Sequence, residues 1–181
     1  MKKSLWSMAG VLVLVLLCQS AYAAPQPLMG VRWSMQEAQV EGLPDQTSGS
    51  AAFILGVAAE RYRIYADLSL QSWDDFSSVM MLANAEKRWP VHSRLALVAG
   101  VHGGIVDFEL DGRFGAKKFQ SGPAAGVQLG GLWQFDTSWQ LEVGLRWTQV
   151  WAEQTGRIDE QATTYRWEEV YGSYIQLGYL F

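Results

Sequence analysis

The sequence predicts an all-β chain in which eight antiparallel strands close into an up-and-down transmembrane β-barrel behind a cleaved N-terminal signal peptide. Three observations point to this fold. Apolar and polar residues alternate with a period of two, which is the pattern of a strand with two unlike faces. Beyond the N-terminal segment, no run of 18 apolar residues offers a membrane helix. Of the 181 residues, 49% are hydrophobic and only 18% are charged, which excludes a disordered chain.

The first 23 residues are typical of a secretory signal peptide. Lys2 and Lys3 give a positive start, residues 11–17 are an unbroken apolar run, and Ala21-Tyr22-Ala23 has the small-x-small pattern of a signal-peptidase site. The alternative, an N-terminal membrane helix, needs about 20 apolar residues, more than this run provides. We therefore expect cleavage after Ala23, with 1–23 as the signal peptide and 24–181 as a single barrel domain.

Removal of this segment changes the chemistry of the chain. Cys18 is lost, so the mature chain has no disulfide and no cysteine ligand for a metal. Lipidation of Cys18 is not expected because Leu17, which precedes it, is not small. Two lysines and no acid are removed, so the formal charge changes from −4 to −6. This acidic balance gives no basic footprint for nucleic acid.

Eight segments of 10 to 15 residues carry the alternation, a length that suits tilted membrane strands. In chain order we expect strands at 28–39, 50–60, 62–73, 76–88, 93–107, 122–135, 138–152 and 167–181. The seventh is clearest, with Leu141, Val143 and Leu145 on one face and polar residues between them. Tight connections are expected near Arg61, at 89–92 and at 136–137, with longer ones after the fifth and seventh strands. Both termini then share the short-turn side.

The polar face distinguishes a membrane barrel from a soluble, lipocalin-like one. It carries glycines, which suit a narrow lumen better than a solvated surface: Gly30, Gly56, Gly100, Gly104, Gly126, Gly130, Gly144, Gly172 and Gly178. A water-facing exterior would also be rich in lysine, whereas the mature chain has three lysines. The apolar face carries no charge in mid-strand, as lipid contact requires. The sequence therefore favours an apolar exterior in a membrane.

Aromatic residues gather near the expected strand ends, which predicts two interfacial girdles. The short-turn girdle would contain Tyr62, Trp89, Phe135, Trp139, Tyr179 and Phe181. The long-loop girdle would contain Trp73, Phe76, Trp147, Trp151, Trp167 and Tyr171.

With these features the chain resembles the small OmpA/OmpX-like outer membrane β-barrel proteins of Gram-negative bacteria. The last strand, Ser173-Tyr-Ile-Gln-Leu-Gly-Tyr-Leu-Phe181, carries the resemblance most directly. It implies an outer-membrane location and a C-terminal sorting signal, matched by Ile175, Leu177, Tyr179 and Phe181. It also implies lipid and lipopolysaccharide as surroundings, with the β-barrel assembly machinery and periplasmic chaperones as partners during biogenesis. No loop motif of a particular subfamily is present.

Inward parity places charges of both signs in the lumen: Arg32, Glu60, Arg63, Asp67, Glu86, Arg94, Glu142 and Arg146. Charges in a narrow lumen must pair or stay hydrated. Two interpretations remain open here, a salt-bridge plug that fills the barrel and a gated path for small ions or solutes.

Few residues suit catalysis. His92 lies beside Ser93 in a predicted turn, the single hint of a lipid A deacylase, and His102 is expected to point inward near Glu142 or Asp67. Asp107, Glu109 and Asp111 share one side but lack the spacing of a cation-binding loop. We expect no metal or other cofactor.

The predicted role is therefore non-catalytic, in envelope structure or surface interaction such as adhesion. The alternatives are a lipid A-modifying enzyme and a small-solute channel. Arg113, Lys117 and Lys118 lie in the loop after the fifth strand, where two interpretations stay open: a solvated loop, or contact with lipopolysaccharide phosphates or another anionic polymer. The sequence names no surface ligand, and we expect a monomer.

Overall fold

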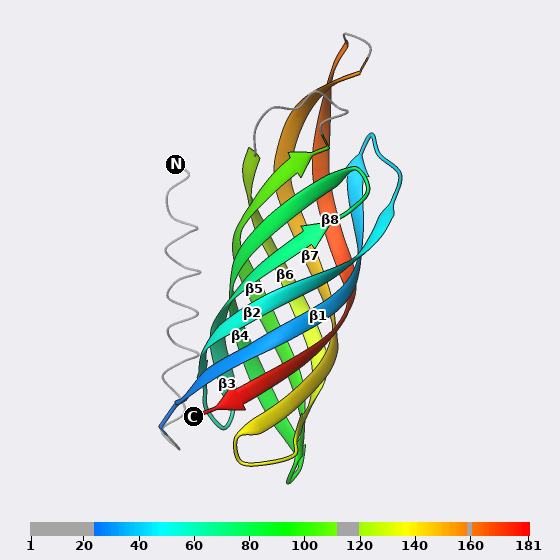
Figure 1. Ribbon diagram of the computed structural model, residues 1–181. Helices are drawn as coiled ribbons and strands as arrows, with labels where there is room; N and C mark the ends of the chain where they lie inside the picture. The colour runs from blue at the N-terminus through cyan, green and yellow to red at the C-terminus, as the bar shows by residue number, and fades with distance from the viewer. Residues whose placement is uncertain (1–23, 112–119, 159–160) are drawn as a thin grey trace, which may run out of the picture.

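The computed structural model of the protein describes residues 24–111, 120–158 and 161–181. The predicted signal peptide and the loop cations Arg113, Lys117 and Lys118 lie outside these ranges. The described chain forms one closed antiparallel barrel in which each strand pairs with the next and β8 pairs with β1 (Figure 1). The strands are β1 (Gln26–Glu41), β2 (Gln46–Ala58), β3 (Tyr62–Ser72), β4 (Phe76–His92), β5 (Leu95–Leu110), β6 (Gln120–Gln134), β7 (Trp139–Ile158) and β8 (Gln161–Leu180). The predicted fold class is confirmed.

The two ends of the barrel differ, as expected. The turns β2–β3, β4–β5 and β6–β7 lie at the end where β1 begins and β8 finishes, which we call the turn end (Figure 1). The opposite end, the loop end, carries the remaining connections. At the turn end the chain closes on itself, because the Phe181 amide donates a hydrogen bond of 3.1 Å to the Pro27 carbonyl. Among the described residues, no helix is long and apolar enough to cross a membrane.

Two predicted connections are wrong in detail. The long connection expected after the seventh strand is mostly ladder, because β7 and β8 stay paired out to Ile158 and Gln161. The backbone hydrogen bonds between β7 and β8 continue beyond the point where the apolar alternation stops. A strand that is solvated on its outer face needs no apolar residues there. The tight turn expected at 89–92 lies later, because β4 continues to His92 and Pro90 pairs with Ala96.

The outer surface of the barrel is apolar through its middle. Large side chains there point away from the lumen and are half or more exposed, such as Leu129 at 60% and Leu145 at 65%. The inward positions between them are buried and largely polar. A closed barrel with this inverted pattern satisfies its backbone internally and presents hydrocarbon outward, which is the architecture of a transmembrane β-barrel.

The aromatic girdles are correct only in part. Trp89, Phe135 and Trp139 face outward at the turn end, where Tyr179 packs between Trp139 and Phe181 with ring centroids 5.0 and 4.9 Å apart. At the loop end, Trp147, Trp151 and Tyr171 also face outward. However, Trp73, Phe76 and Trp167 are buried inside the barrel. For these three the girdle prediction is wrong.

Inward glycines allow neighbouring strands and their side chains to approach. A Cβ on Gly126 would lie 2.0 Å from the Trp147 carbonyl oxygen and 2.6 Å from His102 Nε2. Gly131, on the same strand, faces outward, and a Cβ there would meet nothing within 4 Å. The two positions therefore form a matched pair.

We expect Gly126→Ala to lower the free energy of unfolding by about 1 to 3 kcal/mol, the usual cost of overpacking. Gly131→Ala should leave it nearly unchanged. Urea titration of both variants refolded in lipid vesicles measures the difference. Equal effects at the two positions would contradict the packed lumen at β6.

Candidate functional site: a filled lumen

The centre of the lumen is a belt of polar side chains from seven of the eight strands, which we call the polar belt. Its members all point inward and are buried. They are Arg32, Arg63, Tyr65, Asp67, Asn84, Glu86, His102, Gln128, Glu142, Arg146, Tyr174 and Gln176. The alternation of each strand delivers them to the inside, because every second residue faces the lumen.

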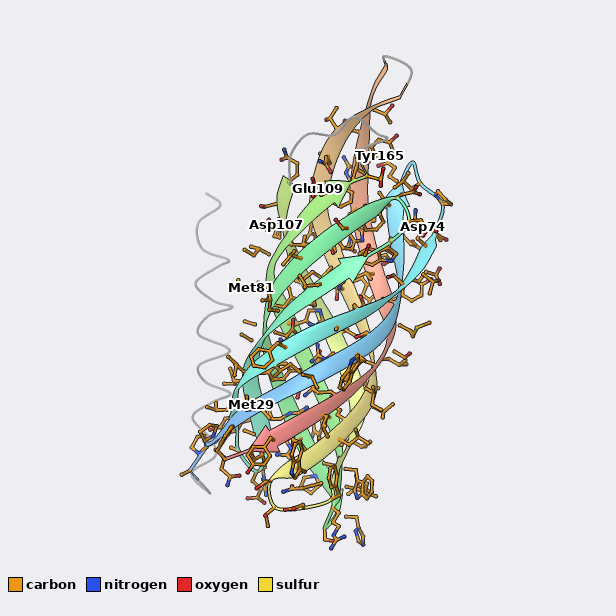
Figure 2. The ribbon with its side chains drawn as sticks, viewed as in Figure 1. Met29, Asp74, Met81, Asp107, Glu109 and Tyr165 are labelled. Atoms are coloured by element: carbon orange, nitrogen blue, oxygen red, sulfur yellow. The ribbon has the colours of Figure 1, made fainter. Side chains whose placement is uncertain are left out.

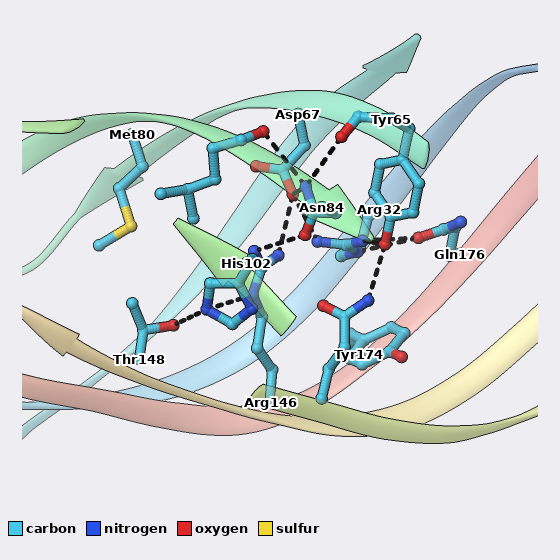
Figure 3. Close-up of polar contacts among 12 residues, drawn as sticks. Arg32, Tyr65, Asp67, Met80, Asn84, His102, Arg146, Thr148, Tyr174 and Gln176 are labelled. Atoms are coloured by element: carbon cyan, nitrogen blue, oxygen red, sulfur yellow. Dashed lines mark hydrogen bonds and ion pairs between the residues drawn. The ribbon is translucent and has the colours of Figure 1, made fainter. Parts of the chain in front are cut away.

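Asp67 is the acceptor of one group in the belt. Its Oδ2 accepts hydrogen bonds from Arg32 Nη1 at 2.9 Å, from Arg146 Nη1 at 3.0 Å and from Asn84 Nδ2 at 3.0 Å (Figure 3). Arg146 Nη2 also donates to Asn84 Oδ1 at 3.1 Å. One carboxylate on β3 thus joins two arginines that come from β1 and β7.

Arg63, four residues nearer the turn end on the same strand as Asp67, is the donor of a second group in the belt. Its guanidinium pairs with the carboxylates of Glu86 and Glu142. Glu86 also accepts hydrogen bonds from the Tyr65 hydroxyl and the Gln128 amide. Glu142 accepts a hydrogen bond from the Tyr174 hydroxyl. Each buried carboxylate therefore has several donors, which offsets the cost of removing its charge from water.

Arg32 connects the two groups. Its guanidinium donates to Gln176 Oε1 at 2.8 and 3.0 Å and to the Tyr65 hydroxyl at 2.7 Å. It also lies over the Tyr174 ring, with its Cζ 5.0 Å from the ring centroid. The belt is a single network in which three arginines face three carboxylates, so the charges within it balance.

The predicted lumen charges fall into two groups. Six of them, Arg32, Arg63, Asp67, Glu86, Glu142 and Arg146, lie together in the belt. Glu60 and Arg94 do not: both are exposed at the turn end, in the connections that follow β2 and β4. Their inward parity has no meaning there because the strands have ended. Apart from His102, the neutral members of the belt are not predicted by the sequence analysis, although their inward positions follow the same alternation.

The two histidines occupy different environments. His102 is buried, with Nε2 2.9 Å from the Thr148 hydroxyl and 3.5 Å from Arg146 Nε. The sequence analysis expected His102 to lie near Glu142 or Asp67, but His102 hydrogen-bonds to neither, because arginines hold both carboxylates. His92 is exposed at the turn end, where its Nδ1 lies 3.1 Å from the Ser93 hydroxyl.

Above the belt, toward the loop end, four aromatic rings fill the lumen; we call this group, Trp73, Phe76, Phe108 and Trp167, the aromatic plug. Trp73 and Phe76 stack with centroids 4.5 Å apart. Trp167 lies edge-on to both, at 5.4 and 5.3 Å, and 5.6 Å from Phe108. Trp167 is fully buried. The apolar cluster around these rings includes Val40, Val106, Leu110, Val150 and Val170.

Trp167 faces inward because the pairing of β8 shifts. Its neighbours in register change between Gln39 and Val40 on β1 and between Gln149 and Ala152 on β7. Inward positions on β8 consequently step by three residues, from Val170 to Trp167, rather than by two. A bulge of this kind reverses the facing of every residue beyond it.

Below the belt, toward the turn end, Leu28, Ile54, Ala58 and Leu180 form a second apolar cluster with the Tyr65 ring. Between the belt and the plug lies a cavity of about 10 Å³, room for about one water molecule. The lumen is thus filled in three layers. In the described part of the chain, no group of three His, Cys, Asp or Glu residues is placed to hold a metal ion.

Similar architectures occur among the solved structures of other proteins. No family model matches the sequence, and no curated protein is similar enough to count as a match. Among solved structures, Neisserial surface protein A is similar with a TM-score of 0.72 at 14% identity, over 88% of this chain and 100% of that one. Outer membrane protein H of P. aeruginosa has a TM-score of 0.58 at 20% identity, over 86% and 99%. The outer membrane protein OprG of Pseudomonas aeruginosa has a TM-score of 0.51 at 9% identity, over 88% and 97%.

Proposed function

We propose that this chain, which has the fold of small eight-stranded outer membrane β-barrels, resides as a monomer in the outer membrane of a Gram-negative bacterium after removal of residues 1–23. There it has a non-catalytic role in envelope structure or surface interaction. The filled lumen carries this proposal, because a barrel whose middle is closed by a charge network and an aromatic plug has no open pore through it. We therefore assign the interaction to the exposed surfaces of the barrel.

Location is tested by fractionation. The protein should be found in the outer-membrane fraction, embedded in lipid and lipopolysaccharide, and N-terminal sequencing should begin at Ala24. Recovery as soluble periplasmic protein would contradict the proposal. The loop cations Arg113, Lys117 and Lys118 remain candidates for contact with an anionic surface ligand.

The non-catalytic role is tested on lipid A. Ser93 and His92 are hydrogen-bonded, but a hydrolytic triad also needs an acid that orients the histidine. In the part of the chain that the structure describes, no hydrogen bond joins His92 to a carboxylate. Mass spectrometry should therefore show the same lipid A acylation with and without the gene. A changed acyl pattern that Ser93→Ala abolishes would establish the enzyme alternative instead.

The closed lumen predicts low conductance, to which the aromatic plug and the polar belt both contribute. Trp167→Ala should remove the centre of the aromatic plug and cost about 3 to 5 kcal/mol of unfolding free energy. Planar-bilayer recordings should show little current for the wild type. The variant should show no more than brief events, because the polar belt still closes the barrel. Stable, large conductance of the wild-type protein would favour the channel alternative.

We propose that Ile175, Leu177, Tyr179 and Phe181 form the sorting signal read by the β-barrel assembly machinery, with periplasmic chaperones delivering the chain. These side chains lie on the outward face of β8, and Phe181 is largely exposed. Because these side chains lie on the outer face, packing of the barrel interior does not determine their identity, and they can serve as a recognition signal in the unfolded chain.

Deletion of Phe181 separates sorting from packing. As a packing loss it should cost about 1 to 3 kcal/mol, so the truncated chain should refold into lipid almost normally. Its assembled amount in cells should fall sharply. Phe181→Tyr, which keeps the terminal ring, is the control. Equal losses in cells and in vesicles would mean that Phe181 is only structural.

A further inference from the structure

A cavity of about 450 Å³ opens at the turn end of the barrel, below the three filled layers. Its inner surface includes the apolar side chains of Ala58, Leu132 and Leu180, which belong to or adjoin the lower apolar cluster. Its polar wall is made by Arg88, and its rim by Glu60, His92, Ser93 and Arg94. The cavity is therefore an apolar recess with charged groups at its opening.

Arg88 is the one deeply buried charge in this wall. Its side chain faces inward from β4 and is only 9% exposed. Its Nη1 donates to the Ala59 carbonyl at 3.1 Å, but its buried Nε has no hydrogen-bond partner among the described residues. A buried donor without an acceptor is unfavourable, and for an arginine the deficit is larger because the group is charged.

The nearest carboxylates of the lumen do not satisfy Arg88. Glu86 and Glu142 lie within the polar belt and are held by Arg63, with the Tyr65 and Tyr174 hydroxyls as further donors. At the cavity itself, Arg88 and Arg94 face a single acid, Glu60. The recess therefore has an excess of positive charge, part of it from the Arg88 guanidinium.

We propose that this turn-end cavity binds a small amphiphilic anion, a carboxylate or phosphate that carries a short apolar chain. The anionic head would accept from the part of the Arg88 guanidinium that lines the cavity, a charge-assisted bond, and Arg94 would add attraction at the rim. The apolar chain would lie against Leu132 and Leu180. The site opens on the side of the chain termini and is separate from the loop end, where a surface ligand would act.

The test uses the refolded barrel in zwitterionic micelles, with hexanoate and acetate as ligands. The side-chain NMR signal of Arg88 Nε–H, assigned by its loss in Arg88→Gln, should shift saturably as hexanoate is added. The protein should bind acetate at least about tenfold more weakly, because acetate buries little apolar surface. Hexyl phosphate should compete with hexanoate. The absence of any saturable shift at millimolar ligand would overturn the proposal.

Two variants separate the site from general charge effects. Lys87→Gln removes an equal charge from the adjacent residue, which is exposed on the outer face beside Trp89. It should leave the affinity for hexanoate within about twofold, whereas Arg88→Gln should lower it at least about tenfold, the loss of one charged hydrogen bond. Arg88→Lys keeps the charge without the guanidinium and should also weaken binding. Equal weakening by Lys87→Gln, or full affinity in Arg88→Gln followed at the Leu132 amide, would refute the site.

Discussion

Replacing Arg63 by methionine should lower the free energy of unfolding by about 3 to 5 kcal/mol, the cost of breaking a buried ion pair by removing one partner. The guanidinium of Arg63 pairs with both Glu86 and Glu142, and all three groups are sealed from solvent. Without it, the two carboxylates face each other in a site that water does not reach. Methionine keeps most of the volume, so the loss measures charge rather than a cavity.

The control removes the charges together. The triple variant Arg63→Met, Glu86→Gln, Glu142→Gln leaves no uncompensated ion and should recover most of the stability lost in the single variant. Equilibrium unfolding in urea, followed by tryptophan fluorescence in lipid vesicles, compares the three proteins. If Arg63→Met alone costs less than about 1 kcal/mol, the typical value of an exposed pair, the belt is hydrated and the lumen is not closed.

Period-two alternation explains why the sequence places the charged residues of the belt on the inward face. Arg63 and Asp67 on β3 are four residues apart, and so are Glu142 and Arg146 on β7, so each strand alone fixes the common face of its pair. Depth along the barrel is a different matter. It depends on how far each strand is shifted against its neighbour, and sequence does not specify that shift. The sequence therefore identified the charged set but not that Tyr65, Gln128 and Tyr174 lie at the same depth to complete it.

The plug shows where alternation fails. On β8, Trp167 and Tyr171 are separated by an even step and should share a face, yet the ring of Trp167 is inside and that of Tyr171 outside. The register shift between them arises from pairing with β1 and β7, which local sequence does not reveal. Trp73 and Phe76 differ from this case. Their parity agrees with the inward faces of β3 and β4, so their assignment to a girdle gave too much weight to position near a strand end.

Predictions at the ends of strands were also wrong, because the alternation of side chains does not report where backbone pairing stops. Glu60 and Arg94 follow the inward parity of their strands but lie in turns, where the backbone no longer alternates. Conversely, β7 and β8 remain paired at Ile158 and Gln161, beyond the last apolar alternation. Figure 2 shows Glu109 and Tyr165 in this loop-end region, where Glu109 faces away from the lumen and Tyr165 is buried. Outside the membrane, backbone hydrogen bonds alone can extend a hairpin.

Leu145→Arg should prevent stable insertion, because it places a charge on the lipid face near the middle of the barrel. Leu145 is 65% exposed on β7, with Leu129 and Ser173 as its neighbours on β6 and β8, between the outward rings of Trp139 and Trp147. An arginine near the bilayer midplane of such a barrel costs about 2 to 4 kcal/mol. Refolding yield and urea unfolding in vesicles should both fall.

Val91→Arg is the matched control for depth. Val91 is 67% exposed, but it lies at the turn end of β4, close to the outward ring of Trp89. A charge near the interface costs only about 0 to 1 kcal/mol, because its head reaches water. The same substitution, with the same exposure, should therefore be severe at position 145 and mild at position 91. If the two variants lost stability equally, the outer face would contact water rather than lipid, and the barrel would be of the soluble kind.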